Sequence, residues 1–196
     1  MSKKKKAFAI RTDLALEACE MLKANEDTEI DGIVSSVKEN KDTSITCVDI
    51  INEQGSKAVG KPIGKYITIE DQGLRTNNIE TKERIIEETT KALKLLLKNF
   101  TAENVLIAGL GNRFITPDAL GPKVVSGILV TRHIKDTLPE EMKNKVNSVS
   151  AIAPGVMGIT GIETAEVLAG IAKKAKPDLI IAVDALAARK FSRVNA

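Results

Sequence analysis

The sequence has 196 residues, a length that is enough to bury a hydrophobic core. Its composition, 43% hydrophobic and 28% charged, excludes a disordered chain. No run of about 18 apolar residues occurs, so no membrane partner is expected, and the basic N-terminus lacks the apolar stretch of a secretory signal. Cys19 and Cys47 are too few for a disulfide framework, and no His or Cys cluster has the spacing of zinc ligands. We therefore expect a protein of the cell interior.

The basic charge lies at one end of the chain. The net charge is +3, yet residues 1–13 hold five basic side chains and one acid, so the remaining chain carries −1. A nucleic-acid-binding surface needs basic side chains spread over a folded face, usually with aromatic rings for stacking. Since aromatic residues make up only 3%, we expect no direct nucleic-acid partner.

The predicted elements of the first half are a short helix, several strands and a long helix. Thr12 or Asp13 is a candidate cap for the first helix, which runs to about Asn25. β-Branched or alternating runs predict strands over residues 30–37, 44–51 and 65–70. Apolar residues at helical spacing predict the long helix over residues 81–100. The first half thus predicts a β-rich N-terminal region.

The second half alternates strands and helices. We expect strands at residues 105–108, 149–153 and 179–183, and helices at residues 121–133 and 163–175. This rhythm is typical of the α/β class, and we predict a mixed, mostly parallel central sheet flanked by helices. Function in such a sheet gathers at the carboxyl ends of its strands.

Two aspartates follow buried strands of this predicted sheet. Asp118 lies in the loop TPDALG beyond the strand at 105–108, and Asp184 directly follows the strand at 179–183. By themselves, both also suit a turn or cap, and Arg189 is a possible partner for Asp184. Two carboxylates in one crevice can hold a proton between them, so one activates water while the other protonates a leaving amine. Spacing alone does not show that they meet.

Two glycine-containing loops are the other candidate sites. Residues 109–112 read GLGN after a buried strand, but Phe114 stands where a GxGxxG motif has its third glycine, which leaves a tight structural turn or an anion- or nucleotide-binding loop. Gly155, Gly158 and Gly161 precede a helix, where backbone N–H groups could bind a substrate. A flexible connection is the alternative for that loop. The lone His133 suits a surface position better than catalysis.

Several long strings place the whole chain in one family. It resembles the germination proteases of spore-forming bacteria at FAIRTDLALEA (8–18), GKYITIE (64–70), GLGNRFITPDALGPKVV (109–125), TRHI (131–134), SAIAPGVMGITGIET (150–164) and PDLIIAVDALAARKFSRVNA (177–196). The resemblance implies an endopeptidase that degrades small acid-soluble spore proteins, in the cytoplasm of the spore core. It also implies a homotetramer and a fold similar to that of hydrogenase maturation endopeptidases.

The resemblance assigns the catalytic roles to Asp118 and Asp184. The family has been classified both as metallo- and as aspartic-type peptidases. This sequence has no HExxH motif, so we favour the aspartic type, with no cofactor and no bound metal. The two alternatives are a hydrogenase-maturation-like peptidase that senses a metal and a non-enzymatic α/β module that binds an anion or nucleotide.

The family removes its own propeptide, and the cleavage maps between Asp13 and Leu14. The family prefers an acid, a hydrophobic residue and alanine around the bond, as in Asp13-Leu14-Ala15. Ile10 departs from the acid that usually stands four positions before the bond, which suits slow self-cleavage. We therefore predict a propeptide at 1–13 and a single peptidase domain at 14–196, truncated at its C-terminus because family chains continue further. We expect assembly and full activity to need that further part.

Overall fold

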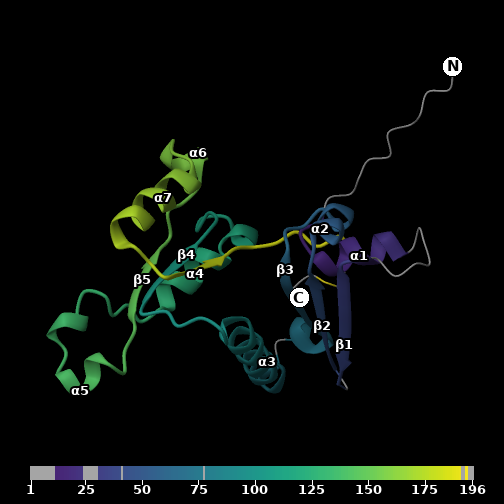
Figure 1. Cartoon of the computed structure of the whole chain (residues 1–196), viewed down its shortest axis with the longest axis horizontal. Helices are drawn as coiled ribbons and strands as arrows, with labels where there is room; N and C mark the ends of the chain where they lie inside the picture. The colour runs from purple at the N-terminus through teal and green to yellow at the C-terminus, as the bar shows by residue number, and fades with distance from the viewer. Residues whose placement is uncertain (1–11, 24–30, 41, 77, 191–192, 194–196) are drawn as a thin grey trace. The chain divides into compact units, whose positions relative to one another are not determined.

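Figure 1 shows the fold of the chain as a computed structural model. The structure describes residues 12–23, 31–40, 42–76, 78–190 and 193. The chain divides into two compact units, one within residues 1–98 and 186–196 and the other within residues 99–185. A single domain over 14–196 stays a prediction. No helix in the described part is long and apolar enough to cross a membrane.

The first unit is built on an antiparallel sheet of three strands in the order β1-β2-β3. The strands are β1 (Ile33–Glu39), β2 (Thr43–Ile50) and β3 (Gly64–Asp71). Helix α1 (Ala15–Lys23) packs against β2 and β3. The core of this unit is small and apolar, and its buried residues are Ala18, Cys19, Val48, Ile50 and Val59.

Two more helices complete this unit. Helix α2 (Glu53–Val59) is not predicted by the sequence, because two turns carry too little apolar periodicity. It is fixed by its ends: Asn52 Oδ1 accepts the N–H of Gly55 at 2.8 Å, and Gly60 closes the helix in the left-handed conformation. Helix α3 (Ile79–Leu97) follows the 3₁₀ turn η1 (Gln72–Thr76) and packs against β3.

The second unit is an α/β layer on a parallel sheet in the order β5-β4-β6. Its strands are β4 (Asn104–Gly109), β5 (Ser148–Ile152) and β6 (Leu179–Val183). The flanking helical segments are η2 (Thr116–Asp118), α4 (Leu120–Gly127), η3 (Lys135–Thr137), α5 (Glu140–Lys143), α6 (Met157–Thr160) and α7 (Thr164–Ala175). The α/β class with a parallel sheet flanked by helices is therefore confirmed. The sheet was predicted to be mixed, whereas its three described strands are all parallel.

One predicted helix is wrong in length. The helix expected at 121–133 ends at Gly127, because Ile128 has extended backbone angles of −79° and 133°. The chain beyond it turns to the sheet, where the N–H groups of Thr131 and Arg132 donate to the Val149 carbonyl at 2.9 and 3.0 Å. Asn25, the expected end of the first helix, lies outside the described residues.

Candidate active site

Asp118 is held in the loop that follows β4. It is the last residue of η2, a turn that Pro117 favours by fixing its backbone angle. One carboxylate oxygen, Oδ2, accepts the N–H of Asn112 at 2.7 Å, and the side chain is partly buried. This contact ties Asp118 back to the GLGN turn at the carboxyl end of β4.

Two glycines make this arrangement possible. Gly111 has a φ of +103°, which side-chain-bearing residues rarely adopt, and a Cβ there would collide with the Asp118 backbone. Gly121, in the first turn of α4, leaves no room for a Cβ against the carbonyls of Leu110 and Val183. The loop after β4, the start of α4 and the end of β6 are therefore in close contact.

Asp184 follows the last residue of β6. Gly109 of β4 pairs with Val183 of β6, and the N–H of Leu110 donates to the Val183 carbonyl at 2.8 Å. The Asp184 side chain is exposed, and its Oδ1 accepts the N–H of Ala185 at 2.8 Å. Asp118 and Asp184 thus lie in loops that leave the same edge of the sheet, at the ends of neighbouring strands.

The two carboxylates do not hydrogen-bond to each other in the described part of the chain. Each accepts one backbone N–H of its own loop and keeps a second oxygen, Oδ1 of Asp118 and Oδ2 of Asp184, without a hydrogen-bond donor there. The second oxygen of each side chain can accept a hydrogen bond from water or from a peptide N–H at this edge.

The loop with three glycines contains a short helix. Gly155 and Gly161 have φ values of +81° and +69°, and Gly158 lies within α6. Gly161 ends α6 in the left-handed conformation, and its N–H donates to the Met157 carbonyl. These glycines shape a helix and its end, and substrate binding by Gly155, Gly158 and Gly161 stays a prediction.

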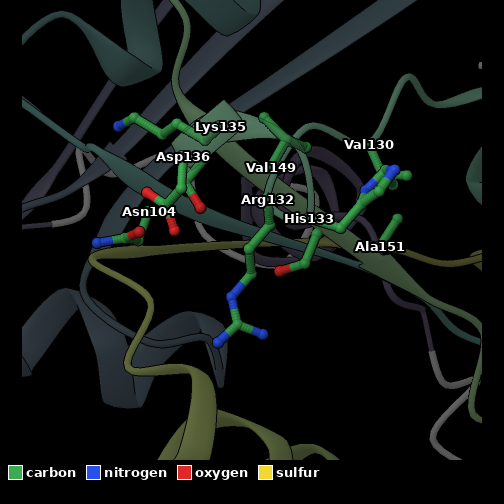
Figure 2. A pocket seen from close by; sticks show the side chains of 10 residues that line it. Asn104, Val130, Arg132, His133, Lys135, Asp136, Val149 and Ala151 are labelled. Carbon is green, nitrogen blue, oxygen red and sulfur yellow. The ribbon is translucent and has the colours of Figure 1, made fainter. Parts of the chain in front are cut away.

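A cavity of the second unit lies elsewhere, beside β5. It has a volume of about 760 Å³, and its walls include Asn104, Arg132, His133, Lys135, Asp136 and the residues of β5 from Ser148 to Ala151. Figure 2 shows the charged ends of Arg132 and Lys135 pointing away from each other (Figure 2). Neither Asp118 nor Asp184 lines this cavity, so the cavity and the two acids are separate candidates.

No group of three or more His, Cys, Asp or Glu side chains within the described ranges has the arrangement of a metal site. His133 is exposed and lines the cavity beside β5.

Asp13 and Leu14 lie in the first unit, just before α1. The N–H of Asp13 donates to the Ala187 carbonyl at 3.1 Å, and the N–H of Ala187 donates to Oδ2 of Asp13 at 2.9 Å. Leu14 provides the first carbonyl of the helix, which accepts the N–H of Ala18 at 3.2 Å. The bond between Asp13 and Leu14 therefore lies in an ordered, hydrogen-bonded stretch.

A comparison with protein families decides the affiliation of the chain. A family model described as germination protease matches residues 11–196. The chain belongs to the germination protease family. It is similar to the germination protease of Caldanaerobacter subterraneus subsp. tengcongensis, with 47% identity over 188 residues, 96% of this chain and 57% of the relative.

Further germination proteases match over the same part of the chain. The protein of Priestia megaterium is 44% identical over 197 residues, covering 96% of this chain and 53% of its own length. That of Clostridium tetani is 44% identical over 188 residues, covering 96% of this chain and 58% of its own length. The chain thus spans somewhat more than half the length of these germination proteases.

Sequence reasoning missed two residues of this germination protease family member, Glu17 and Ala187. The structure places both in hydrogen-bond contact with residues next to the predicted cleavage bond. Glu17, only 1% exposed, accepts the hydroxyl of Thr12 and the N–H groups of Arg189 and Lys190. Ala187 contacts Asp13 only through its backbone, for which a sequence has no signal. The acid in the first turn of α1 was the one available hint.

Proposed function

We propose that the chain is the part of a spore germination endopeptidase that carries its catalytic acids. Its family and the names of its relatives support this function. The substrates we propose are small acid-soluble spore proteins in the spore core, and the complete protein assembles as a homotetramer.

The observation that carries the mechanism is the place of the two acids. Asp118 and Asp184 follow the ends of paired parallel strands, which is where ligands bind in sheets of this kind. In the proposed reaction one ionised carboxylate takes a proton from water as the water oxygen bonds to the peptide carbonyl carbon. The other, protonated, carboxyl gives its proton to the nitrogen as the C–N bond breaks. The two acids exchange roles before the next turnover.

Three finer proposals accompany this one. Residues 1–13 are a propeptide that the protein removes itself by cutting between Asp13 and Leu14. The parallel sheet belongs to the same fold type as that of hydrogenase maturation endopeptidases. The peptidase is of the aspartic type.

Single substitutions of the acids test the mechanism. Asp118→Asn and Asp184→Asn, assayed on a peptide with a Glu-Ile-Ala site, should each lower kcat at least 100-fold, since each removes a proton acceptor of the reaction. The control is Asp136→Asn, which changes an acid of the cavity beside β5 and should leave turnover unchanged. Full activity of either aspartate variant would remove that residue from the mechanism, and loss in Asp136→Asn alone would move the site to the cavity.

Two further measurements separate the alternatives. Loss of activity on chelation that added metal restores would favour the metal-dependent peptidase. Tight binding of a phosphate-bearing ligand at residues 109–112 that survives both aspartate substitutions, without peptide cleavage, would favour the anion-binding module.

A further inference from the structure

Thr131 covers part of the outer edge of β5, which is one of the two edge strands of the parallel sheet in the described part of the chain. The N–H of Thr131 donates to the Val149 carbonyl at 2.9 Å. Its Oγ1 accepts the N–H of Val149 at 2.9 Å and donates to the Asn147 carbonyl. One buried threonine therefore occupies the backbone groups that a further strand would need at Val149.

The next residue that faces outward from β5 is Ala151, and the edge is open there. The N–H of Ser148 donates to the Glu103 carbonyl at 2.7 Å, on the side of β4, whereas the backbone groups of Val149 point away from β4. Since these groups alternate between the two sides of a strand, the N–H and C=O of Ala151 point the same way as those of Val149. Neither group of Ala151 has a hydrogen-bond partner among the described residues.

The cavity beside β5 gives a peptide access to this open edge. The cavity has a volume of about 760 Å³, and Ala151 and His133 are part of its wall. In Figure 2, Ala151 and His133 lie at one end of the cavity, and Asn104 and Asp136 lie at the other (Figure 2). Asn104 pairs with Ser148 at the start of β5, so the cavity follows the strand toward its C-terminal end.

This end of β5 belongs to the same edge of the sheet as the two acids. The strands β4, β5 and β6 are parallel, so their C-terminal ends lie together. Asp118 and Asp184 follow β4 and β6 at that edge, within the same compact unit. A chain that pairs with Ala151 and continues past the end of β5 therefore runs toward the edge with the two acids.

We propose that the N–H and C=O of Ala151 bind the main chain of the substrate, which adds to the outer edge of β5 as a short strand. The inference rests on the proposed function, and it adds the place where the substrate backbone is held. An unpaired N–H and C=O on a strand edge match the backbone of an extended peptide, and such strand addition is a common way of binding peptides. Thr131 sets where the pairing begins, because it already occupies Val149.

The open edge is too short to hold a second copy of the chain. β5 ends at Ile152, and Pro154 has no N–H to continue the pairing. A stable interface between two proteins buries about 1,600 Å² in total, which one outward-facing residue does not provide. A substrate must leave after it is cut, so a short stretch of pairing suits it.

Amide exchange measured by NMR tests the contact on the Asp184→Asn chain, in which cleavage should be too slow to consume the peptide. A synthetic peptide with a central Glu-Ile-Ala site should slow exchange of the Ala151 amide at least fivefold. The amides of Ser150 and Ile152 face β4 and should keep their rates. An Ala151 rate that the peptide leaves unchanged would overturn the proposal. Slowing that follows protein concentration without peptide would also overturn it, because it would indicate a second copy at this edge.

Two substitutions of Ala151 separate its backbone from its side chain. Ala151→Pro removes the outward N–H and no bond to β4, as proline does on edge strands, and should raise the Kd of the peptide at least fivefold. Ala151→Gly keeps the N–H, is the matched control and should change the Kd less than twofold. Continued protection of the Ser150 and Ile152 amides in Ala151→Pro verifies that the sheet is intact. Equal Kd values for the two variants would overturn the proposal.

Peptides with one N-methylated amide test the same pairing without any change in the protein. Since alternate residues of a strand face its neighbour, methylation at the position that pairs with Ala151 should raise the Kd at least fivefold. Methylation of the following residue should change it less than twofold. A series of peptides in which no position stands out in this way would contradict strand addition.

Cleavage of the unmodified peptide by the unsubstituted chain separates this proposal from the proposed function. Slower exchange of the Ala151 amide without any cleavage contradicts the proposed function alone. Cleavage by a chain whose Ala151 amide is unaffected by the peptide contradicts the edge site alone.

Discussion

Glu17 is a buried acid that the fold satisfies completely. Burial raises the pKa of its carboxyl, but hydrogen bonds from Thr12 and from the amides of Lys190 and Arg189 outweigh this effect and leave the pKa lowered. The guanidinium of Arg193, 3.5 Å away, adds a favourable charge. Glu17 therefore stays ionised inside the unit as long as its donors stay in place.

Removing Arg193 should destabilise the first unit strongly. Arg193→Ala leaves the buried Glu17 without the guanidinium and Glu20 with only the exposed Lys190, and breaking one partner of a buried ion pair costs about 3–5 kcal/mol. The free energy of unfolding in urea, followed by circular dichroism, measures this loss. The control is Lys190→Ala, which breaks only an exposed pair with Glu20 and should cost less than about 1 kcal/mol. Equal losses in the two variants would refute the buried role of Arg193.

Stability should fall in acid through Glu20. Arg193 lowers the pKa of Glu20 from 4.5 to about 2, so its contribution is complete above pH 4.5 and disappears as the pH falls toward 2. Because the side chain is 34% exposed, we expect about 1–2 kcal/mol after allowance for solvent screening. Urea unfolding at pH 6, 4 and 3 measures the slope. Glu20→Gln should flatten it, and an unchanged slope in this variant would contradict the assignment.

At the scale of elements, the contact between β6 and the start of α4 depends on Gly121. A Cβ at this position would collide with the carbonyls of Leu110 and Val183, so Gly121→Ala should destabilise the second unit by about 1–3 kcal/mol. Gly127→Ala is the matched control in the same helix, where a Cβ meets nothing within 4 Å and alanine should be neutral or stabilising. Thermal unfolding of both variants checks the difference. A larger loss at Gly127 would show that the close approach is not what matters.

The strands were the most predictable elements. β6 lies where the apolar run LIIAV predicts it, and β4 and β5 differ from prediction by one residue at either end. Their β-branched and apolar runs carry a strong local signal. Helix α7 starts one residue after the predicted Glu163, which is its N-cap and forms a capping box with Glu166.

The helix α4 and the site were less predictable, because they depend on contacts remote in sequence. Local helical propensity does not predict that α4 ends at Gly127. The chain leaves the helix because Thr131 and Arg132 hydrogen-bond to Val149, which is remote in sequence. The sequence indicated Asp118 and Asp184 correctly as residues beyond strand ends, but strand order decides that the two strands are neighbours. Backbone contacts such as that of Ala187 carry no side-chain signature at all.

At the scale of the whole molecule, acid-sensitive groups are unevenly divided between the units. Among the described carboxyl groups, those with lowered pKa in the first unit are Glu17, Glu20, Asp71 and Glu87. The second unit has Asp178, an exposed acid that accepts the N–H groups of Glu103 and Asn104. A carboxyl whose pKa is lowered by folding stabilises less as the pH falls toward that pKa.

We therefore expect the first unit to open before the second on acidification. Hydrogen exchange at pH 3, compared with pH 6, should lose protection in β2 and β3 while β4 and β6 remain protected. Arg84→Ala, which removes the partner that lowers the pKa of Asp71, should reduce the difference between the two pH values in β3. Earlier loss of protection in β4 would contradict this order.

The segment that carries Ala187 and Arg193 also has a consequence for synthesis. Glu17 and Glu20 leave the ribosome early, yet the partners Arg189, Lys190 and Arg193 follow 170 residues or more later. Contacts so distant along the chain are slow to form. The N-terminal unit of a nascent chain therefore stays incomplete, with Glu17 still in water, until the parallel sheet has been translated. Residues 186–193 complete the first unit only after the second unit has been translated, so a nascent chain that stops before them would present an unfinished first unit to chaperones and proteases.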